Sequence, residues 1–172
     1  RQKNIKSVIL RFFNVCSALN KPVVGELHNP ETHLIPTIVY KAIYNKKIYI
    51  YGNDFPTPDG TCIRDYIHVM DLADAHMKSI KYLCENYKNN ITVNLSTGKG
   101  HSVLDVIKRV ENITGNQINF KIAKRRKGDP SELVAISHKA LEQIGWSAKY
   151  SDLDTIIKSA WEWSQKIESI VV

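Results

Sequence analysis

Two arginines lie in stretches that would present them to an anion. Residues 52–68 read GNDFPTPDGTCIRDYIH and end with Arg64, Asp65 and a strand-like segment. The Asn, Asp, Pro and Gly of this stretch are turn formers, and strand-like residues 48–51 and 63–69 flank it. An ordered loop of this length inside a compact domain is more often functional than idle. The pattern therefore predicts a rigid loop that offers a guanidinium to an anion, and the alternative is a surface hairpin with a salt bridge.

A second cationic stretch occurs at residues 124–130, which read KRRKGDP and follow a strand candidate at 118–122. Four consecutive cations are most often a solvated charge run. At the end of a strand, the planar guanidinium groups of such a run can instead bind phosphate in a two-pronged manner. Both interpretations remain open from the residues alone.

Three further groups are candidates for polar contacts. Asn14 follows the apolar run 7–12, which predicts a buried parallel strand, and ligands bind at the carboxyl edge of such sheets. His28 and His33 are five residues apart with a proline between them. With no third nitrogen or thiolate nearby in the sequence, that pair argues against a metal site. Gly98 and Gly100 predict a tight turn rather than a phosphate loop, because the third glycine is absent.

The elements that position these groups alternate between strand and helix patterns. Apolar residues recur at helical spacing over 34–45, 71–87, 102–114, 137–144 and 152–166. Asp71 is the expected N-cap of the second of these helices, Ser102 with Asp105 forms a weak capping box, and Gly115 and Gly145 close two helices. Residues 20–33 are expected to be a polar loop. The alternation predicts an α/β fold with parallel strands.

Composition limits the classes of protein. The chain has 172 residues, of which 43% are hydrophobic and 24% charged, a composition typical of a globular domain. It contains no apolar run of the length that a membrane span needs. The formal net charge is +7, but the cations are scattered and no nucleic-acid-binding signature is present. Three widely spaced cysteines fit a reducing cytoplasm rather than a disulfide framework.

Residues 51–69, YGNDFPTPDGTCIRDYIHV, resemble the signature of the UDP-glucose 4-epimerases, NAD-dependent members of the extended short-chain dehydrogenase/reductase superfamily. The resemblance extends to GELHNPETHLIP at 25–36, RRKGDP at 125–130 and the C-terminal region. It implies the C-terminal part of a Rossmann-like α/β fold, with a few sheet strands and a small mixed substrate-binding region. Ser17 departs from the family pattern, where a glycine stands.

The resemblance also implies roles for individual residues. The diphosphate of a UDP-sugar would contact Arg64 and Arg126, and its ribose would contact Asp129. Tyr49 and Tyr51 would lie beside uracil, and Leu133 is the position that helps to set tolerance for N-acetylated sugars. The remaining implied contacts are on the sugar–phosphate side (Asn14, His33, Leu34) and on the nicotinamide of NAD (Phe12, Phe13).

The catalytic elements of such an enzyme are missing from this sequence. No Gly-x-x-Gly-x-x-Gly loop occurs, and none of the eight tyrosines has a lysine four residues later. Residues 1–172 are therefore expected to be the substrate-binding half of an epimerase, inactive alone, with NAD held mainly by an absent N-terminal half. The complete enzyme is expected to be a cytoplasmic homodimer of galactose metabolism that interconverts UDP-glucose and UDP-galactose through a 4-keto intermediate. The alternatives are another nucleotide-sugar enzyme of the superfamily, a dehydratase or decarboxylase, or a truncated non-catalytic product.

Overall fold

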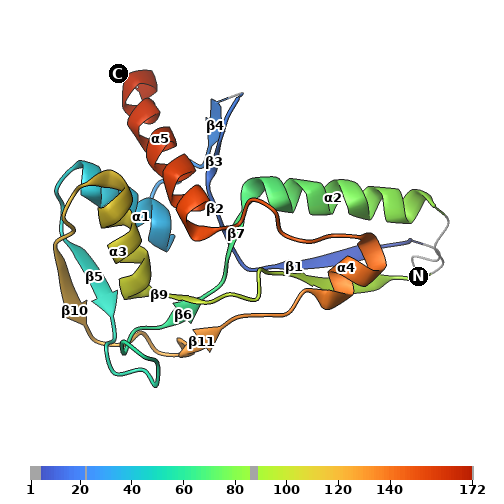
Figure 1. The fold of residues 1–172 in the computed structure, drawn as a ribbon, viewed down its shortest axis with the longest axis horizontal. Coiled ribbons are helices and arrows are strands. Elements are labelled where there is room, and N and C mark those ends of the chain that lie inside the picture. Colours follow the sequence, from blue (N-terminus) through green and yellow to red (C-terminus); the bar gives the residue numbers. More distant parts are fainter. Residues whose placement is uncertain (1–4, 22, 86–88, 172) are drawn as a thin grey trace.

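The computed structural model describes residues 5–21, 23–85 and 89–171 (Figure 1). The strands are β1 (Val8–Phe12), β2 (Asn14–Cys16), β3 (Ala18–Asn20), β4 (Val23–Gly25), β5 (Ile48–Tyr51), β6 (Ile63–Arg64), β7 (Tyr66–His68), β8 (Ile91–Leu95), β9 (His101–Ser102), β10 (Phe120–Ala123) and β11 (Glu132–Leu133). The helices are α1 (Leu34–Ile43), α2 (Val69–Cys84), α3 (Val103–Thr114), α4 (His138–Ile144) and α5 (Leu153–Val171). The expected α/β fold is confirmed.

Most strands pair in parallel with a partner that is distant in the sequence. β1 pairs with β8 from Val8↔Ile91 to Phe12↔Leu95, and β2, β5 and β6 pair in parallel with β7, β10 and β11. β9 joins β6 on its other side in the antiparallel direction, which places His101 opposite Arg64. Each parallel pairing brings the segment that follows one strand next to the segment that follows its partner, which is how parallel sheets assemble sites.

The buried side chains form two cores at opposite ends of an elongated molecule (Figure 1). One core lies among α1, α3, α5 and β5 and includes Ile38, Val106 and Ile156. The other lies among β1, β8, α2 and α4 and includes Val93 and Trp146. None of the helices within the described ranges combines the length and the apolarity that a bilayer crossing requires.

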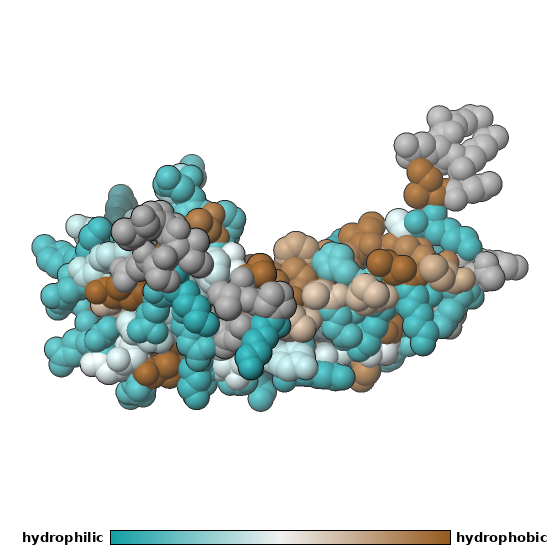
Figure 2. Space-filling view, turned by 90° about the horizontal axis from the view of Figure 1, so that it is seen from above, coloured by the Kyte–Doolittle hydropathy of each residue, from teal (hydrophilic) through white to brown (hydrophobic). Residues whose placement is uncertain are grey.

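The strand predicted at 7–12 forms, but it is not buried on both faces. Val8 and Leu10 pack against the second core, whereas Ile9 and Phe12 are exposed. Successive side chains of a strand point to opposite faces, so Ile9 lies on the face that the described residues leave uncovered. Phe12 lies on the same face as Val8 and Leu10 and is exposed because the second core does not extend to the end of the strand. Figure 2 shows hydrophobic residues gathered on the half of the molecule that contains α2 and β1, where Met77 and Ile80 are also exposed.

Three local predictions were wrong. The expected strand 63–69 is divided into β6 and β7, and α2 already begins at Val69. The N-cap of α2 is His68, whose Nδ1 accepts from the Met70 amide at 3.1 Å, and not Asp71. The Tyr87 end expected for that helix lies outside the described residues. The segment expected to be a loop from residue 20 contains β4, which forms an antiparallel hairpin with β3.

The expected caps of the other helices were mostly correct. Ser102 Oγ accepts from the Asp105 amide at 3.0 Å at the start of α3. Gly115 and Gly145 adopt left-handed conformations, with φ of 73° and 64°, at the ends of α3 and α4. Such φ values carry no Cβ penalty for glycine, so these residues end the helices at low cost.

Candidate functional site

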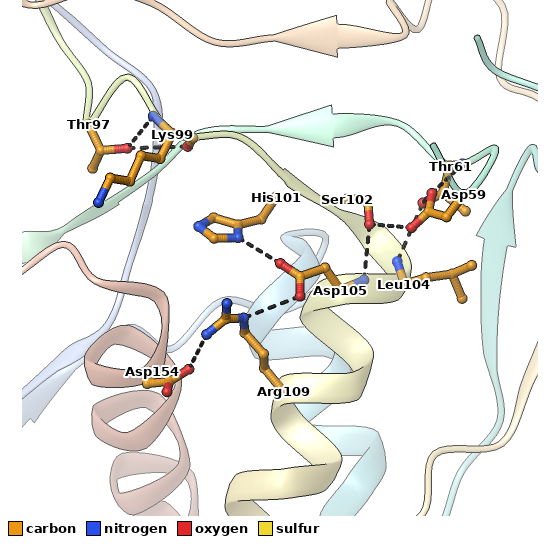
Figure 3. Close-up of polar contacts among 10 residues, drawn as sticks. All are labelled: Asp59, Thr61, Thr97, Lys99, His101, Ser102, Leu104, Asp105, Arg109 and Asp154. Atoms are coloured by element: carbon orange, nitrogen blue, oxygen red, sulfur yellow. Dashed lines mark hydrogen bonds and ion pairs between the residues drawn. The ribbon is translucent and has the colours of Figure 1, made fainter. Parts of the chain in front are cut away.

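The loop that precedes Arg64 is rigid because its own polar groups close it. Asp59 accepts from the amide and the hydroxyl of Thr61 at 2.9 and 2.7 Å, and also from the Ser102 hydroxyl (Figure 3). The Phe55 amide donates to the Gly60 carbonyl at 3.0 Å, and the Phe55 ring is buried. Gly60 has φ +79°, and a Cβ there would collide with the Asn53 carbonyl, so this turn requires glycine.

The electrostatics of Asp59 follow from these contacts. Partial burial acts to raise the pKa of Asp59, but the hydrogen bonds from Ser102 and Thr61 outweigh it, so the net pKa is lowered. Asp59 is therefore a structural acceptor that stays ionised, and it fixes the loop against the start of α3.

A second network in Figure 3 anchors β9 and α3, which support β6. His101 Nδ1 lies 2.7 Å from Asp105 Oδ2, and Arg109 Nε lies 3.2 Å from Asp105 Oδ1. Arg109 Nη1 donates to Asp154 Oδ1 at 2.8 Å, which joins α3 to α5. Since β9 pairs with β6, these contacts hold the backbone that carries Arg64.

Arg64 lies on β6 and is held above the 128–130 turn. Its side chain is only 14% exposed. Nη1 donates to the Ile63 carbonyl at 2.8 Å and to the Pro130 carbonyl at 3.0 Å, while Nη2 is 3.8 Å from Asp129 Oδ1. The guanidinium is thus oriented by backbone acceptors and not by a strong carboxylate partner.

Arg126 and Tyr51 complete a cluster around Asp129, which we call the arginine cluster (Tyr51, Arg64, Arg126 and Asp129). Arg126 Nε is 2.9 Å from Asp129 Oδ2, and the Arg126 guanidinium lies 4.9 Å from the centroid of the Tyr51 ring. Arg126 is 60% exposed, so it can turn towards a ligand. Two guanidinium groups and an exposed ring suit a ligand that joins a polyanion to a flat ring.

Tyr49 and Leu133 border the arginine cluster. Tyr49 and Tyr51 alternate with buried Ile48 and Ile50, so both rings lie on the exposed face of β5. Leu133, on β11, pairs in register with Arg64 and is exposed. These positions agree with a shared surface, although their roles remain predictions.

Asn14 is linked to the same region through the backbone. Its Nδ2 donates to the Asp65 carbonyl at 2.8 Å, next to Arg64, because β2 pairs with β7. The amide therefore links the start of β2 to the residue between β6 and β7, and a ligand contact of Asn14 remains a prediction.

His33 and Leu34 lie at the start of α1, and the described contacts do not join them to the arginine cluster. His33 is the N-cap of α1 but makes no side-chain cap; its Nδ1 lies 3.0 Å from carboxylate oxygens of both Glu26 and Glu31. Leu34 packs against the first core. His33 thus has partners that sequence spacing did not reveal.

Phe12 and Phe13 lie at the carboxyl end of β1. The Phe12 ring is exposed, and the Phe13 amide donates to the Leu95 carbonyl at 3.3 Å, which continues the pairing with β8. An exposed ring at this edge fits a contact with a planar cofactor, while the sequence contains no glycine-rich loop for a pyrophosphate.

A family model described as GDP-mannose 4,6 dehydratase matches residues 1–159. The chain belongs to this family. It is 43% identical over 162 residues to the UDP-glucose 4-epimerase of Lacticaseibacillus casei, covering 94% of this chain and 49% of that protein. It is 44% identical over 164 residues to the UDP-glucose 4-epimerase of Streptococcus mutans serotype c, covering 95% and 49%.

Solved structures of this dehydratase and epimerase family share the fold. The UDP-glucose 4-epimerase from Brucella ovis in complex with NAD gives a TM-score of 0.87 at 43% identity, over 92% of this chain and 49% of that one. The enzyme from Stenotrophomonas maltophila with bound NAD and formylated UDP-arabinopyranose gives 0.91 at 36% identity, over 98% and 50%. The resemblance to UDP-glucose 4-epimerases is confirmed, and the chain spans about half the length of the relatives it matches.

Asp65 is a family-motif residue whose structural importance the sequence did not reveal. It is fully buried and accepts from the Thr97 amide and hydroxyl at 3.0 and 2.8 Å and from the Gly98 amide at 3.0 Å. Burial raises the pKa of Asp65, against the opposing effect of these hydrogen bonds. Its position directly after Arg64 was the only available signal.

Arg125 was also missed. Its Nε is 2.6 Å from Asp54 Oδ1, and its guanidinium stacks 3.9 Å from the centroid of the Phe55 ring. One arginine of the cationic run therefore holds the loop, while its neighbour Arg126 faces Asp129. The resemblance assigned a role to Arg126 and none to Arg125, whose partner Asp54 is 71 residues away in the sequence.

Proposed function

We propose that this chain supplies the UDP-sugar-binding half of a UDP-glucose 4-epimerase. The observation that carries the proposal is the arginine cluster, in which two guanidinium groups lie beside one carboxylate and an exposed tyrosine ring packs against one of them. A second support is the similarity to relatives named UDP-glucose 4-epimerase, which match nearly the whole of this chain.

In this proposal the diphosphate of the ligand replaces Asp129 as the anionic partner of Arg64 and Arg126. Arg64 and Arg126 would each donate charge-assisted hydrogen bonds to phosphate oxygens, and Asp129 would then accept from the ribose hydroxyls. Tyr49 and Tyr51 would flank uracil. Asn14, His33 and Leu34 would line the sugar–phosphate side, where the N-terminus of α1 favours negative charge. Leu133 would border the sugar pocket.

NAD, when bound, would accept and return the hydride of the sugar. Within this chain the residues that fit it are Phe12 and Phe13 at the end of β1, and the rest of its site would come from a glycine-rich half that this sequence lacks. This chain would hold the UDP portion firmly while the sugar remains free to turn. The binding energy would then come from the UDP portion, remote from the reacting carbon of the sugar. The complete enzyme would be a cytoplasmic homodimer of galactose metabolism.

The first measurement is the intact mass of the protein in its native source. A mass of about twice 19.6 kDa would mean a complete epimerase of which this is one half. A mass near 19.6 kDa would mean a chain that binds UDP without catalysis, and it would contradict the catalytic part of the proposal.

The second candidate function is a nucleotide-sugar dehydratase, which the description of the matching family model favours. A decarboxylase of the same superfamily is a related alternative. The complete gene product is to be offered UDP-glucose, GDP-mannose and UDP-glucuronate separately. Conversion of UDP-glucose to UDP-galactose supports the epimerase; loss of water from GDP-mannose or of carbon dioxide from UDP-glucuronate overturns it.

A further inference from the structure

Four metal-ligating side chains converge away from the arginine cluster, in the segment that joins β4 to α1. They are Glu26, His28, Glu31 and His33, and their potential ligand atoms all lie within 4.8 Å of one another. We call them the His–Glu cluster. The sequence spacing of the two histidines argued against a metal, because no third nitrogen or thiolate lies nearby. In the fold, the two glutamates of the same segment supply the further ligand atoms.

The distances within the His–Glu cluster suit a small cation. His28 Nδ1 is 2.6 Å from Glu26 Oε1 and 3.8 Å from Glu31 Oε2, and His33 Nδ1 is 3.0 Å from both Glu26 Oε1 and Glu31 Oε1. Ligand atoms at zinc–ligand distances of about 2.0–2.2 Å in a tetrahedron lie roughly 3.3–3.6 Å apart. The observed separations bracket that edge, so small side-chain movements would convert the cluster into a coordination shell.

The surrounding structure holds the backbone of the His–Glu cluster in place. Trp163 Nε1 of α5 donates to the Glu26 carbonyl at 2.7 Å, and the ring packs against Gly25. The His33 amide donates to Glu31 Oε1 at 2.7 Å, immediately before α1 begins. Ligands on a backbone anchored at both ends are partly preorganised, which lowers the cost of ordering them around an ion.

The exposure pattern allows an ion to enter. The glutamate side chains are about one-fifth exposed, at 21% and 22%, and the histidine side chains about half exposed, at 54% and 52%. Glu26, His28 and Glu31 also line a cavity of about 770 Å³ between α1 and the end of α5, whose wall includes Lys41 and Tyr40. Solvent therefore reaches the cluster from one side, as a binding site requires.

Charge and ligand type favour a divalent transition metal. Two carboxylates with neutral imidazoles carry a charge of −2, which a divalent ion neutralises. Imidazole nitrogen suits zinc, copper and nickel, whereas calcium and magnesium prefer all-oxygen shells. We propose that Glu26, His28, Glu31 and His33 form a binding site for a divalent transition metal of the zinc class. This inference does not rest on the proposed nucleotide-sugar function, but the two share His33: a His33 side chain that binds the metal does not contact the sugar–phosphate at the same time.

The test is a titration of the chelator-treated chain with zinc chloride by isothermal calorimetry, followed by cobalt substitution. We expect one equivalent of zinc, visible d–d absorption of bound cobalt, and a higher unfolding temperature with zinc than without it. The variants E26Q and H28N each remove one ligand and should weaken zinc binding by at least about tenfold. The matched controls E142Q and H138N change exposed residues of the same types on α4 and should bind as the parent does.

Two results would overturn the inference. One is the absence of stoichiometric zinc binding to the parent chain. The other is binding that E26Q and H28N leave within about twofold of the two control variants, since that pattern would mean adventitious capture by surface histidines. Circular dichroism of each variant shows whether it is folded, and the zinc-dependent rise in unfolding temperature provides a second readout that E26Q and H28N should lose.

Discussion

Replacing Arg64 by alanine tests the proposed diphosphate contact most directly. The Arg64 side chain is 14% exposed and oriented by the carbonyls of Ile63 and Pro130, so its guanidinium is already positioned before a ligand arrives. A hydrogen bond to a charged group contributes about 1.5–3 kcal/mol. Since about 1.4 kcal/mol corresponds to a factor of ten, R64A should raise the dissociation constant of UDP by roughly 10- to 150-fold.

The assay is calorimetric titration of UDP into the complete gene product and into this chain. R64A also removes two hydrogen bonds to backbone carbonyls, so urea unfolding of the variant must show that it is folded under the titration conditions. R64K keeps the charge but loses the planar guanidinium, so its UDP dissociation constant should lie between those of the parent and R64A. K127A removes an exposed cation from the neighbouring run and is the matched control. An unchanged UDP dissociation constant in folded R64A would refute the assignment.

Three further predictions concern stability, measured by urea unfolding. D65N should lose about 1–3 kcal/mol, because Thr97 and Gly98 donate to different oxygens of Asp65 and an amide nitrogen would face one of the donors. A loss equal to that of E142Q, a carboxylate-to-amide change at an exposed residue of α4, would contradict this. Burial lowers the pKa of His68, although Asp71 and Asp152 act in the opposite direction. The stabilisation that this neutral histidine contributes above its unfolded pKa of about 6.5 should therefore be lost as the pH falls through the lower folded pKa. Between about pH 7.5 and about pH 5.5, H68Q should lose less unfolding free energy than the parent does. Ser17 has φ 127° and its hydroxyl accepts from the Val69 amide at 2.9 Å, so S17A should be less stable than S17G by about 1 kcal/mol or more, and the reverse order would exclude backbone strain there.

The elements that the sequence predicted well are those whose determinants are local. Helix α1 was expected over 34–45 and is found at Leu34–Ile43, because apolar residues recur at helical spacing behind Pro36. Gly115 likewise marked the end of α3 through its own backbone freedom. Such signals lie within a few residues of the feature they determine.

The features that were missed depend on residues far apart in the sequence. Strands β9 and β11 have two residues each and exist only because β6 lies between them. Asp71 looked like a helix cap, yet its carboxylate accepts from the amides of Lys149 and Tyr150 at 2.9 Å. The composition of a short segment does not contain such partnerships, so they became visible only in the fold.

The pairing of β1 with β8 has a consequence for synthesis of the chain on the ribosome. Val8 can pair with Ile91 only after the 82 residues between them have been synthesised, and closing so long a loop must come before the contacts that compensate for it. Until then β1 has no partner strand, and its exposed apolar side chains form an aggregation-prone segment of the nascent polypeptide. β1 is therefore open to non-native contacts until residue 95 has been translated and β8 can pair with it.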